Sequence, residues 1–466
     1  MSTTTRASRG ATSISFPPIV GKVAIAFLLL GALTSTWTGI KFPMFGMPSD
    51  VLIVLSVAIS GLLVVFGNLR FSVPLWTLAP CAAILLCLLI RQFDPEPYYL
   101  RVLRYQVQAF RPENQTKALF WLFAILIVPL AIIACTAIER RVTVWTMGAY
   151  ATGATLSSVI AITDLIGLTP KIGRIVAGTN RNNSLFGYDI ENMRWPGLAD
   201  HPNTLACTAV LSIPVVIYFL GTMRWKWIGA IALIVLFGGV LVSGSRGAQA
   251  MAPVVALAAM LWTPNRRSLT RVFSMTVFGA VVAALLLVIS LPSEARRKIL
   301  RLIQGFNVDR YVISSTEASD AQRFTVLKQG LTDWQSYPVF GAGIRHIPEA
   351  HNIYLQLLAA GGFVLFIAML LYWYWILRDG WRLSRMGIVY ARFLMISIGS
   401  WLVLGIVENA LTDRYEYFTV GCIAGLASAY LATSRDRTPS AAQLGESSLV
   451  TTLPDDKERV SVGGER

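Results

Sequence analysis

Long apolar runs alternate with short polar stretches along most of the chain. A run of about 20 apolar residues is the length with which an α-helix crosses the hydrocarbon core of a bilayer. The pattern predicts about twelve such segments, at residues 19–37, 51–66, 73–90, 118–138, 143–163, 203–220, 228–243, 248–262, 273–291, 354–377, 390–407 and 417–432. Because the runs are too long for tilted barrel strands, we predict an all-α, polytopic helical membrane protein.

Composition supports this prediction and excludes a soluble domain. Of the 466 residues, 55% are hydrophobic and only 14% are charged. The net charge is +15, but the Lys and Arg residues are scattered among short loops instead of forming a basic helix with interleaved aromatic residues. We therefore expect membrane lipids as partners and no nucleic acid.

The positions of Lys and Arg predict the orientation of the segments. Cytoplasmic loops retain an excess of basic residues, and a cytoplasmic N-terminus places each of the following on that side: Arg70, Arg140, Arg141, Arg224, Lys226, Arg266, Arg267, Arg271, Arg378, Arg382 and Arg385. The expected organisation is a cytoplasmic N-terminus over 1–18, a transmembrane domain over 19–432, and a disordered cytoplasmic tail over 433–466.

The longest polar segments then lie on the outer face. They include residues 169–202 and a large loop over 292–353, and all three histidines of the chain fall within these two segments. Inside the large loop, residues 318–334 carry apolar side chains at helical spacing, which predicts an amphipathic helix on the membrane surface. Function is expected in these outer loops.

His351 stands directly before an apolar run, in the stretch EAHNIYLQLLAAGG. The positive end of a helix dipole would keep its imidazole neutral near pH 7, so that it could accept a proton as a catalytic base. Asn352 beside it offers an amide that could bind a sugar hydroxyl. The alternative interpretation is a polar residue at a helix start that points toward lipid headgroups.

Two arginines on the same predicted face are candidates for binding a diphosphate. Arg246 lies in VSGSRGAQ, where small neighbours leave backbone amides open to an anion. Arg323 lies in the first turn of the predicted amphipathic helix. The alternatives are an interfacial arginine that extends toward headgroups and an arginine that serves solubility.

The stretch MRWPGLADHPNTLA places a second polar cluster before another apolar run. Arg194, His201 and Asn203 are its candidate substrate-binding residues, and an ordinary helix cap is the alternative for the polar residues nearest the run. No HExxH spacing, P-loop or dinucleotide fingerprint occurs in the sequence. We therefore expect neither a metal nor another cofactor.

Taken together, SRG, QRFTVLKQGLTDW, GAG and AHNIYLQLLAAGG resemble the O-antigen ligase and polymerase superfamily of bacterial membrane glycosyltransferases. The resemblance covers a core over about 194–362. It implies metal-independent transfer of a glycan from undecaprenyl diphosphate to an acceptor hydroxyl, at the periplasmic face of the bacterial inner membrane. The essential histidine of the family falls on His351 and its arginines on Arg246 and Arg323, with Arg310 or Arg345 as alternatives to the latter.

The implied partners are an undecaprenyl-diphosphate-linked glycan, a glycan or glycolipid acceptor, and other membrane proteins of polysaccharide assembly. The alternative function is a secondary transporter or exporter of a polysaccharide or a lipid-linked intermediate. A transporter should have broken helices and ionisable groups near the bilayer midplane, whereas the polar residues here gather at one face. Nothing in the sequence separates a ligase from a polymerase.

Overall fold

The computed structural model describes residues 17–42, 46–67, 69–92, 113–166, 168, 194–263, 315–344, 352–408 and 411–435. Regular structure within these ranges is helical, and the strand-like pairing found there is an isolated bridge between Phe42 and Gly46. The predicted all-α class is confirmed for this part of the chain.

The helices, in chain order, are α1 (Pro18–Thr34), α2 (Pro48–Val65), η1 (Leu75–Thr77), α3 (Leu78–Gln92), α4 (Glu113–Leu122), η2 (Phe123–Ile127), α5 (Val128–Ile138), α6 (Val142–Leu165), α8 (Pro202–Thr222), α9 (Lys226–Ser243), α10 (Arg246–Leu261), α14 (Ser315–Ser336), α15 (Ile353–Arg385), α16 (Tyr390–Leu404), η6 (Arg414–Glu416) and α17 (Tyr417–Arg435). Of these, η2 is a π-helical turn that joins α4 to α5.

Each predicted membrane segment that falls within the described residues overlaps a helix, whereas the segment predicted at 273–291 lies outside them. Five of the described spans are long and apolar enough to cross a membrane by length and composition. They are Pro48–Val65, Ala118–Ile138, Pro202–Thr222, Lys226–Ser243 and Ile353–Arg385. Four further apolar helices are shorter: Pro18–Thr34, Leu75–Ile90, Arg246–Leu261 and Tyr390–Leu404.

Large apolar side chains face outward on these helices. Leu62, Ile231, Leu257 and Ile367 are each more than half exposed, although they lie within apolar helices. A soluble protein rarely exposes so much apolar surface, whereas a lipid-facing helix does so by necessity. The exposure therefore fits a bilayer around the bundle.

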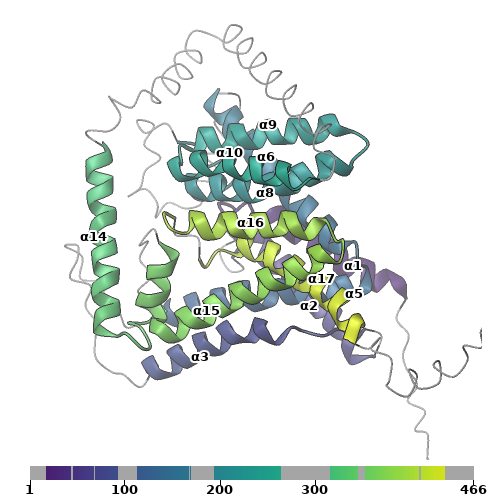
Figure 1. Ribbon diagram of the computed structural model, residues 1–466, viewed down its shortest axis with the longest axis horizontal. Helices are drawn as coiled ribbons and strands as arrows, with labels where there is room; N and C mark the ends of the chain where they lie inside the picture. The colour runs from purple at the N-terminus through teal and green to yellow at the C-terminus, as the bar shows by residue number, and fades with distance from the viewer. Residues whose placement is uncertain are drawn as a thin grey trace, which may run out of the picture.

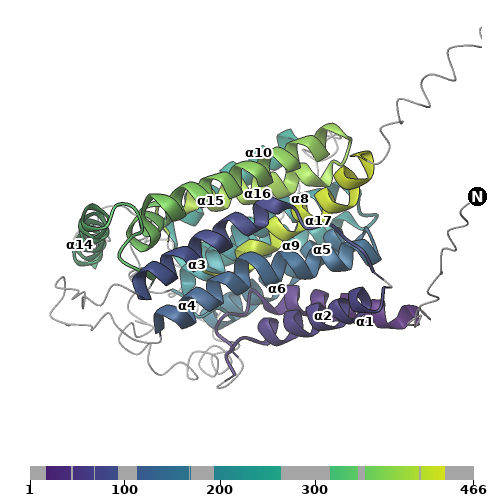
Figure 2. The same cartoon turned by 90° about the horizontal axis from the view of Figure 1, so that it is seen from below.

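The long helices run alongside one another as a bundle, and α14 crosses one end of it (Figures 1 and 2). We call this the α14 end. The beginning of α1 and the end of α17 both lie at the opposite end (Figure 1). The predicted helix over 318–334 is confirmed as part of α14, and a position across the bundle end is what a helix on the membrane surface requires.

Helix α15 is broken near its start. Gly362 has φ 60°, a left-handed conformation that favours glycine, and the helix changes direction there. The turn that follows α14 fits into the break: the N–H groups of Ala342 and Gly343 donate to the carbonyls of Ala359 and Ala360 at 2.7 and 3.1 Å. These two bonds satisfy carbonyls that a continuous helix would have paired.

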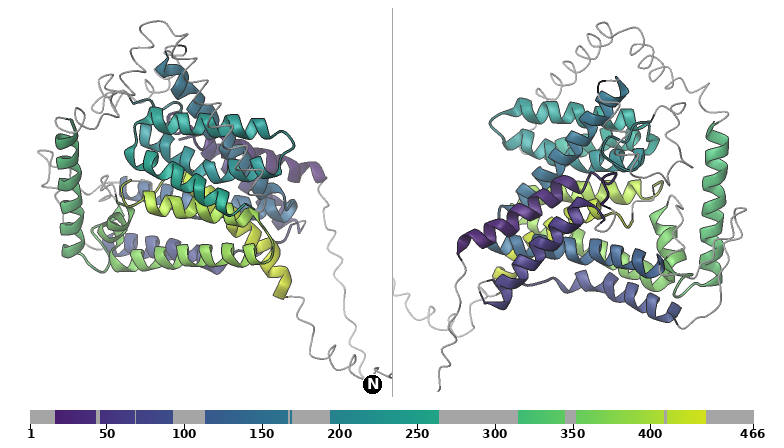
Figure 3. Two further views of the ribbon diagram at one scale, coloured as in Figure 1. Left: turned by 45° about the horizontal axis from the view of Figure 1, so that its top comes forward. Right: turned by 180° about the vertical axis from the view of Figure 1, so that it is seen from behind.

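The same turn also accepts hydrogen bonds from α15. The N–H groups of Phe363 and Val364 donate to the carbonyls of Pro338 and Val339 at 2.8 and 3.1 Å. The four bonds tie the turn to the break, and residues 353–361 run beside α14 before α15 enters the bundle (Figures 1 and 3). We call residues 353–361 the first segment of α15.

Candidate functional site

Three helices begin at the same place at the α14 end. Residues 405–408, which follow α16, contact the first turns of α8, α10 and α15. Asn203 of α8 donates through Nδ2 to Oε2 of Glu408 at 2.8 Å, and Ser245, the residue before α10, donates through Oγ to Oε1 of Glu408 at 3.2 Å. The N–H of Ile353, the first residue of α15, donates to the carbonyl of Gly405 at 2.7 Å.

The turn between α9 and α10 holds Arg246 at the start of α10. Gly244 ends α9 with φ 65°, and this left-handed conformation lets the chain reverse within two residues. Arg194 fixes the turn from outside, because its Nε donates to the carbonyl of Ser243 at 2.9 Å. Arg246 itself is exposed, so its side chain lies on the surface of the bundle end.

Arg194 and Asn203, both predicted to bind substrate, contact each other. A terminal nitrogen of Arg194 donates to Oδ1 of Asn203, whose Nδ2 is bonded to Glu408. Asn203 and Glu408 are buried. Because both amide atoms of Asn203 have protein partners, its geometry is that of a residue that positions Arg194 and Glu408.

His201 and Asn352 are the residues before α8 and α15. Nδ1 of His201 accepts from the N–H of Asn203 at 3.1 Å, and Oδ1 of Asn352 accepts from the N–H of Leu355 at 2.9 Å. Each side chain therefore caps the helix that it precedes. Asn352 also donates through Nδ2 to the carbonyl of Ile406 at 3.2 Å, which ties it to the same four-residue segment.

The other predicted residues are described only in part or not at all. The backbone at Arg323 lies in α14, and its side chain is outside the description. His351, Arg310 and Arg345 lie outside the described residues. In the chain, His351 directly precedes Asn352.

The electrostatics of the assembled site favour an anion. The N-termini of α8, α10 and α15 each carry a positive dipole end and N–H groups without intrahelical partners. Arg194 and Arg246 add formal positive charge beside two of them. The buried carboxylate of Glu408 lies among these groups, where it offsets part of that charge and accepts hydrogen bonds from two of the segments.

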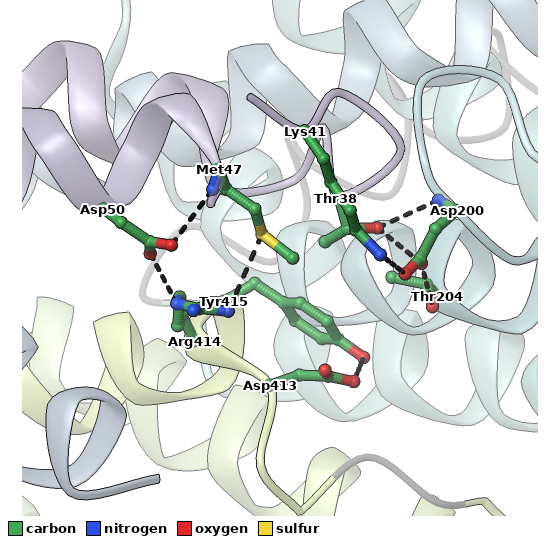
Figure 4. A network of polar contacts seen from close by, with 9 residues as sticks. All are labelled: Thr38, Lys41, Met47, Asp50, Asp200, Thr204, Asp413, Arg414 and Tyr415. Carbon is green, nitrogen blue, oxygen red and sulfur yellow. Dashed lines mark hydrogen bonds and ion pairs between the residues drawn. The ribbon is translucent and has the colours of Figure 1, made fainter. Parts of the chain in front are cut away.

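A second polar network lies beside this site and joins the loops of the α14 end (Figure 4). Asp200, just before α8, accepts from the hydroxyl of Thr38 at 2.7 Å and pairs with Lys41 at 3.2 Å. Arg414, between α16 and α17, pairs with Asp50 in the first turn of α2. The loops after α1 and α16 are thereby linked to α8 and α2.

The two aspartates of this network that lie between helices have opposite pKa shifts. Burial opposes ionisation of Asp200, but the Lys41 ammonium and the Thr38 hydroxyl outweigh it and lower the pKa of this carboxyl. Burial and the negative charge of Asp200 together raise the pKa of Asp413 to about 6, although the Tyr415 hydroxyl donates to it at 3.2 Å. One carboxyl of the pair is therefore charged at neutral pH and the other titrates near it.

Among the described residues, no group of three or more His, Cys, Asp and Glu side chains could hold a metal ion. Metal independence of the reaction remains a prediction.

Comparison with known protein families identifies part of the chain. Residues 230–370 match the family model described as O-antigen ligase. This stretch carries an O-antigen ligase domain. A search of curated proteins found no matching relative. The family match confirms the predicted resemblance to the O-antigen ligase and polymerase superfamily. Together with the apolar helices, it indicates a membrane protein.

The O-antigen ligase domain spans the predicted catalytic residues but not the whole site. It includes Arg246, Arg323, His351 and Asn352, whereas Arg194, His201, Asn203 and Glu408 lie outside 230–370. Sequence reasoning did not single out Glu408. The available signal was a carboxylate directly after the apolar run 390–407, a position where an acidic residue borders the bilayer without a charged neighbour in sequence.

Proposed function

We propose that this protein transfers a glycan from undecaprenyl diphosphate to an acceptor hydroxyl at the periplasmic face of the inner membrane. The observation that carries the proposal is the meeting of three helix N-termini with Arg194 and Arg246 at one end of an apolar bundle that matches O-antigen ligases. A lipid-linked diphosphate approaching from the bilayer would meet positive dipole ends and guanidinium groups together.

The chemistry assigns each group a role. The acceptor oxygen forms a bond to the anomeric carbon, the bond from that carbon to the phosphate oxygen breaks, and the acceptor proton passes to His351. Arg246 and Arg323 neutralise the charge that develops on the departing diphosphate, where a site of low dielectric strengthens each contact. His201 and Asn352 contact sugar at the helix starts.

Arg194 and Asn203 take a positioning role in this mechanism. Arg194 donates through Nε to the carbonyl of Ser243 and through a terminal nitrogen to Oδ1 of Asn203. It therefore fixes the turn that carries Arg246. A group held by two protein partners loses little further entropy when a substrate binds.

A transporter is the competing function, and one observation bears on it. Helix α15 is broken, as transporter helices are, but the break at Gly362 lies nine residues after the helix begins and beside the crossing helix α14. The polar contacts described above likewise gather at the α14 end. This distribution supports chemistry at a membrane surface over passage through the midplane.

The decisive experiment reconstitutes the purified protein in lipid with a diphosphate-linked repeat unit and follows glycan products on gels. We expect wild-type protein to form product and His351→Ala, Arg246→Ala and Arg323→Ala each to lose at least about 100-fold in rate, the loss typical for one oxyanion-stabilising group. Membrane insertion and elution as a monodisperse species should be unchanged. Arg378→Ala, at the opposite end, is the matched control and should retain full activity.

The product pattern then separates the two members of the superfamily. A ladder from donor alone indicates a polymerase, and product only after a second glycolipid is added indicates a ligase. Wild-type activity in His351→Ala would refute the catalytic assignment, and no product with any lipid-linked donor would favour the transporter.

A further inference from the structure

The exposed face of α10 begins with a cation and continues with apolar side chains. Arg246, Ala250, Pro253 and Leu257 are all exposed. Successive residues of an α-helix are about 100° apart, so positions i, i+4, i+7 and i+11 lie on one face. This face of α10 therefore joins a positive charge at the α14 end to apolar side chains that continue along the bundle.

The end of α16 widens this apolar face. The two helices pack against each other, and a Cβ built on Gly247 would lie 3.0 Å from Cγ2 of Val407. Because the start of α10 meets the end of α16, the helices run in opposite directions. Val403, Ile406 and Val407 are all exposed, and Val403 lies one turn deeper in the bundle than Val407.

These side chains form a continuous apolar surface along the seam between the two helices. We call them the α10 strip, which consists of Ala250, Pro253, Leu257, Val403, Ile406 and Val407.

Two residues of the α10 strip lie at the level where lipid headgroups are expected. Ile406 and Val407 belong to the segment 405–408 that contacts the helix starts, so they stand beside Arg246 at the bundle end. Aromatic side chains are the apolar residues that are enriched at this depth in membrane proteins. Exposed aliphatic side chains next to a cation indicate instead a ligand with a negative group and an apolar chain.

The length of the α10 strip corresponds to half of a bilayer. Leu257 lies eleven residues after Arg246, which is about 16 Å along an α-helix. The hydrocarbon core of a bilayer is about 30 Å thick. An amphiphile with its negative group at Arg246 would therefore keep its apolar chain on α10 through the half of the bilayer nearest the α14 end.

The position of the α10 strip distinguishes it from the other apolar faces of the bundle. Bulk phospholipid covers any lipid-facing helix. The α10 strip, in contrast, begins at the arginine proposed to bind the donor diphosphate, and a guanidinium binds phosphate oxygens in a bidentate manner. A hydrocarbon chain attached to that diphosphate would have apolar protein surface beside it from its first carbon atoms onward.

We propose that the polyprenyl chain of the lipid-linked donor binds along the α10 strip, with its diphosphate at Arg246. The inference rests on the proposed function and adds the path of the carrier chain to it. The seam between α10 and α16 is then a binding site for one lipid, whereas the remaining apolar faces contact the bulk bilayer.

Photocrosslinking tests where the polyprenyl chain lies. The photoreactive amino acid p-benzoylphenylalanine replaces Leu257 in the full-length protein in nanodiscs of phosphatidylethanolamine and phosphatidylglycerol, and tagged undecaprenyl diphosphate without sugar is the probe. Ile231 of α9 is the matched control position. It is 52% exposed where Leu257 is 59% exposed, and it lies twelve residues before Ser243, the end of its helix. We expect about 10-fold more probe to be attached at Leu257 than at Ile231.

A second variant tests whether the charged group and the polyprenyl chain occupy one site. Arg246→Gln should lower crosslinking at Leu257 about 10-fold, the effect of one lost hydrogen bond between charged groups, and leave crosslinking at Ile231 unchanged. Arg378→Gln makes the same chemical change at the opposite end of the bundle and should alter neither. Excess untagged undecaprenyl diphosphate should lower crosslinking at Leu257 only. This competition uses the native Arg246, so it tests the site even if Arg246→Gln does not fold.

Bulk lipid contact would give a different pattern. Equal crosslinking at Leu257 and Ile231, or crosslinking at Leu257 that untagged carrier does not lower, would overturn the proposed path. The probe carries no sugar, so these outcomes are independent of glycan transfer. Transfer by a protein with equal crosslinking would refute the path and leave the proposed function, whereas specific crosslinking without transfer would support the path and refute the function.

Discussion

Glu408 contacts both the α8 start and the residue before α10. Its two oxygens accept from Asn203 and Ser245, and the adjoining residues Gly405 and Ile406 accept from the start of α15. One buried carboxylate with two donors, in the segment that follows α16, therefore sets the relative positions of the groups proposed to bind the diphosphate.

Replacement of Glu408 by Ala should lower the rate of glycan transfer at least about 10-fold. The substitution leaves Asn203 and Ser245 each with a buried unpaired atom, at a cost of about 1–3 kcal/mol per group. Glu408→Gln keeps one acceptor oxygen and should be intermediate. Initial rates in the reconstituted assay measure the effect, with the exposed Glu139→Gln at the opposite end as control. A wild-type rate for Glu408→Ala would contradict the positioning role.

Asp413 should make stability depend on pH in a defined direction. Its pKa is about 6 in the folded protein, above the ordinary value of 3.8, so the folded state binds this proton more tightly than the unfolded state does. The stabilisation is fully present below about pH 4 and is lost as the pH rises through 6.

The difference in melting temperature between Asp413→Asn and wild type isolates this effect. We expect the difference, variant minus wild type, to increase between about pH 4 and pH 7 and then to level off, because the amide carries no charge that burial penalises. Scanning fluorimetry in detergent across this range measures it. A difference that is flat or falls with increasing pH would show that Asp413 is not the responsible group.

At the scale of elements, the break in α15 fixes α14 in place. The turn after α14 supplies two donors and two acceptors to the broken helix, and Gly341 lies where this turn approaches α15 most closely. A Cβ at Gly341 would lie 2.3 Å from the backbone carbon of Ala360, so no side chain fits without displacing the turn. The position of Arg323 on α14 depends on this contact.

Gly341→Ala should therefore lower both stability and activity, with a drop in melting temperature of several degrees. Gly387→Ala is the matched control, because Gly387 also has positive φ, at 87°, but nothing lies within 4 Å of its added Cβ. Both variants carry the backbone penalty of about 1 kcal/mol, and the Gly341 variant alone carries the steric one. Equal melting temperatures of the two variants would show that the turn adjusts freely.

At the scale of the molecule, the basic residues of the predicted cytoplasmic loops and the site lie at opposite ends. Arg140 stacks on Tyr430 and Arg378 stacks on Trp375, and both arginines lie on the predicted cytoplasmic side. The helix starts that form the candidate site lie at the α14 end. Positive charge retained in the cytoplasm would thus leave the site outside, where its lipid-linked donor is expected.

Accessibility to an impermeant maleimide tests this orientation. All five cysteines lie within the described residues and are buried, so background labelling should be low. Phe42→Cys, at the α14 end and 49% exposed, should react from the periplasm, whereas Trp225→Cys, which is 60% exposed and follows α8, should react only after the membrane is permeabilised. The reverse pattern would place the site in the cytoplasm and refute the proposed donor.

The sequence alone determined the class, the helices and the domain type. Apolar runs of membrane length are a local property, so each predicted run within the described residues overlaps a helix. The pattern around Arg246, Arg323 and His351 indicated the superfamily that the match over 230–370 confirms. The helix over 318–334 followed from local spacing in the same way.

Only the tertiary structure decided which residues meet. Glu408 and Asn203 are far apart in sequence, and no local pattern pairs a carboxylate after one apolar run with an amide before another. The break at Gly362 and the seam where Gly247 meets Val407 also depend on contacts between distant helices. Helix formation is governed by neighbouring residues, whereas a site is made by packing, and packing is set by the chain as a whole.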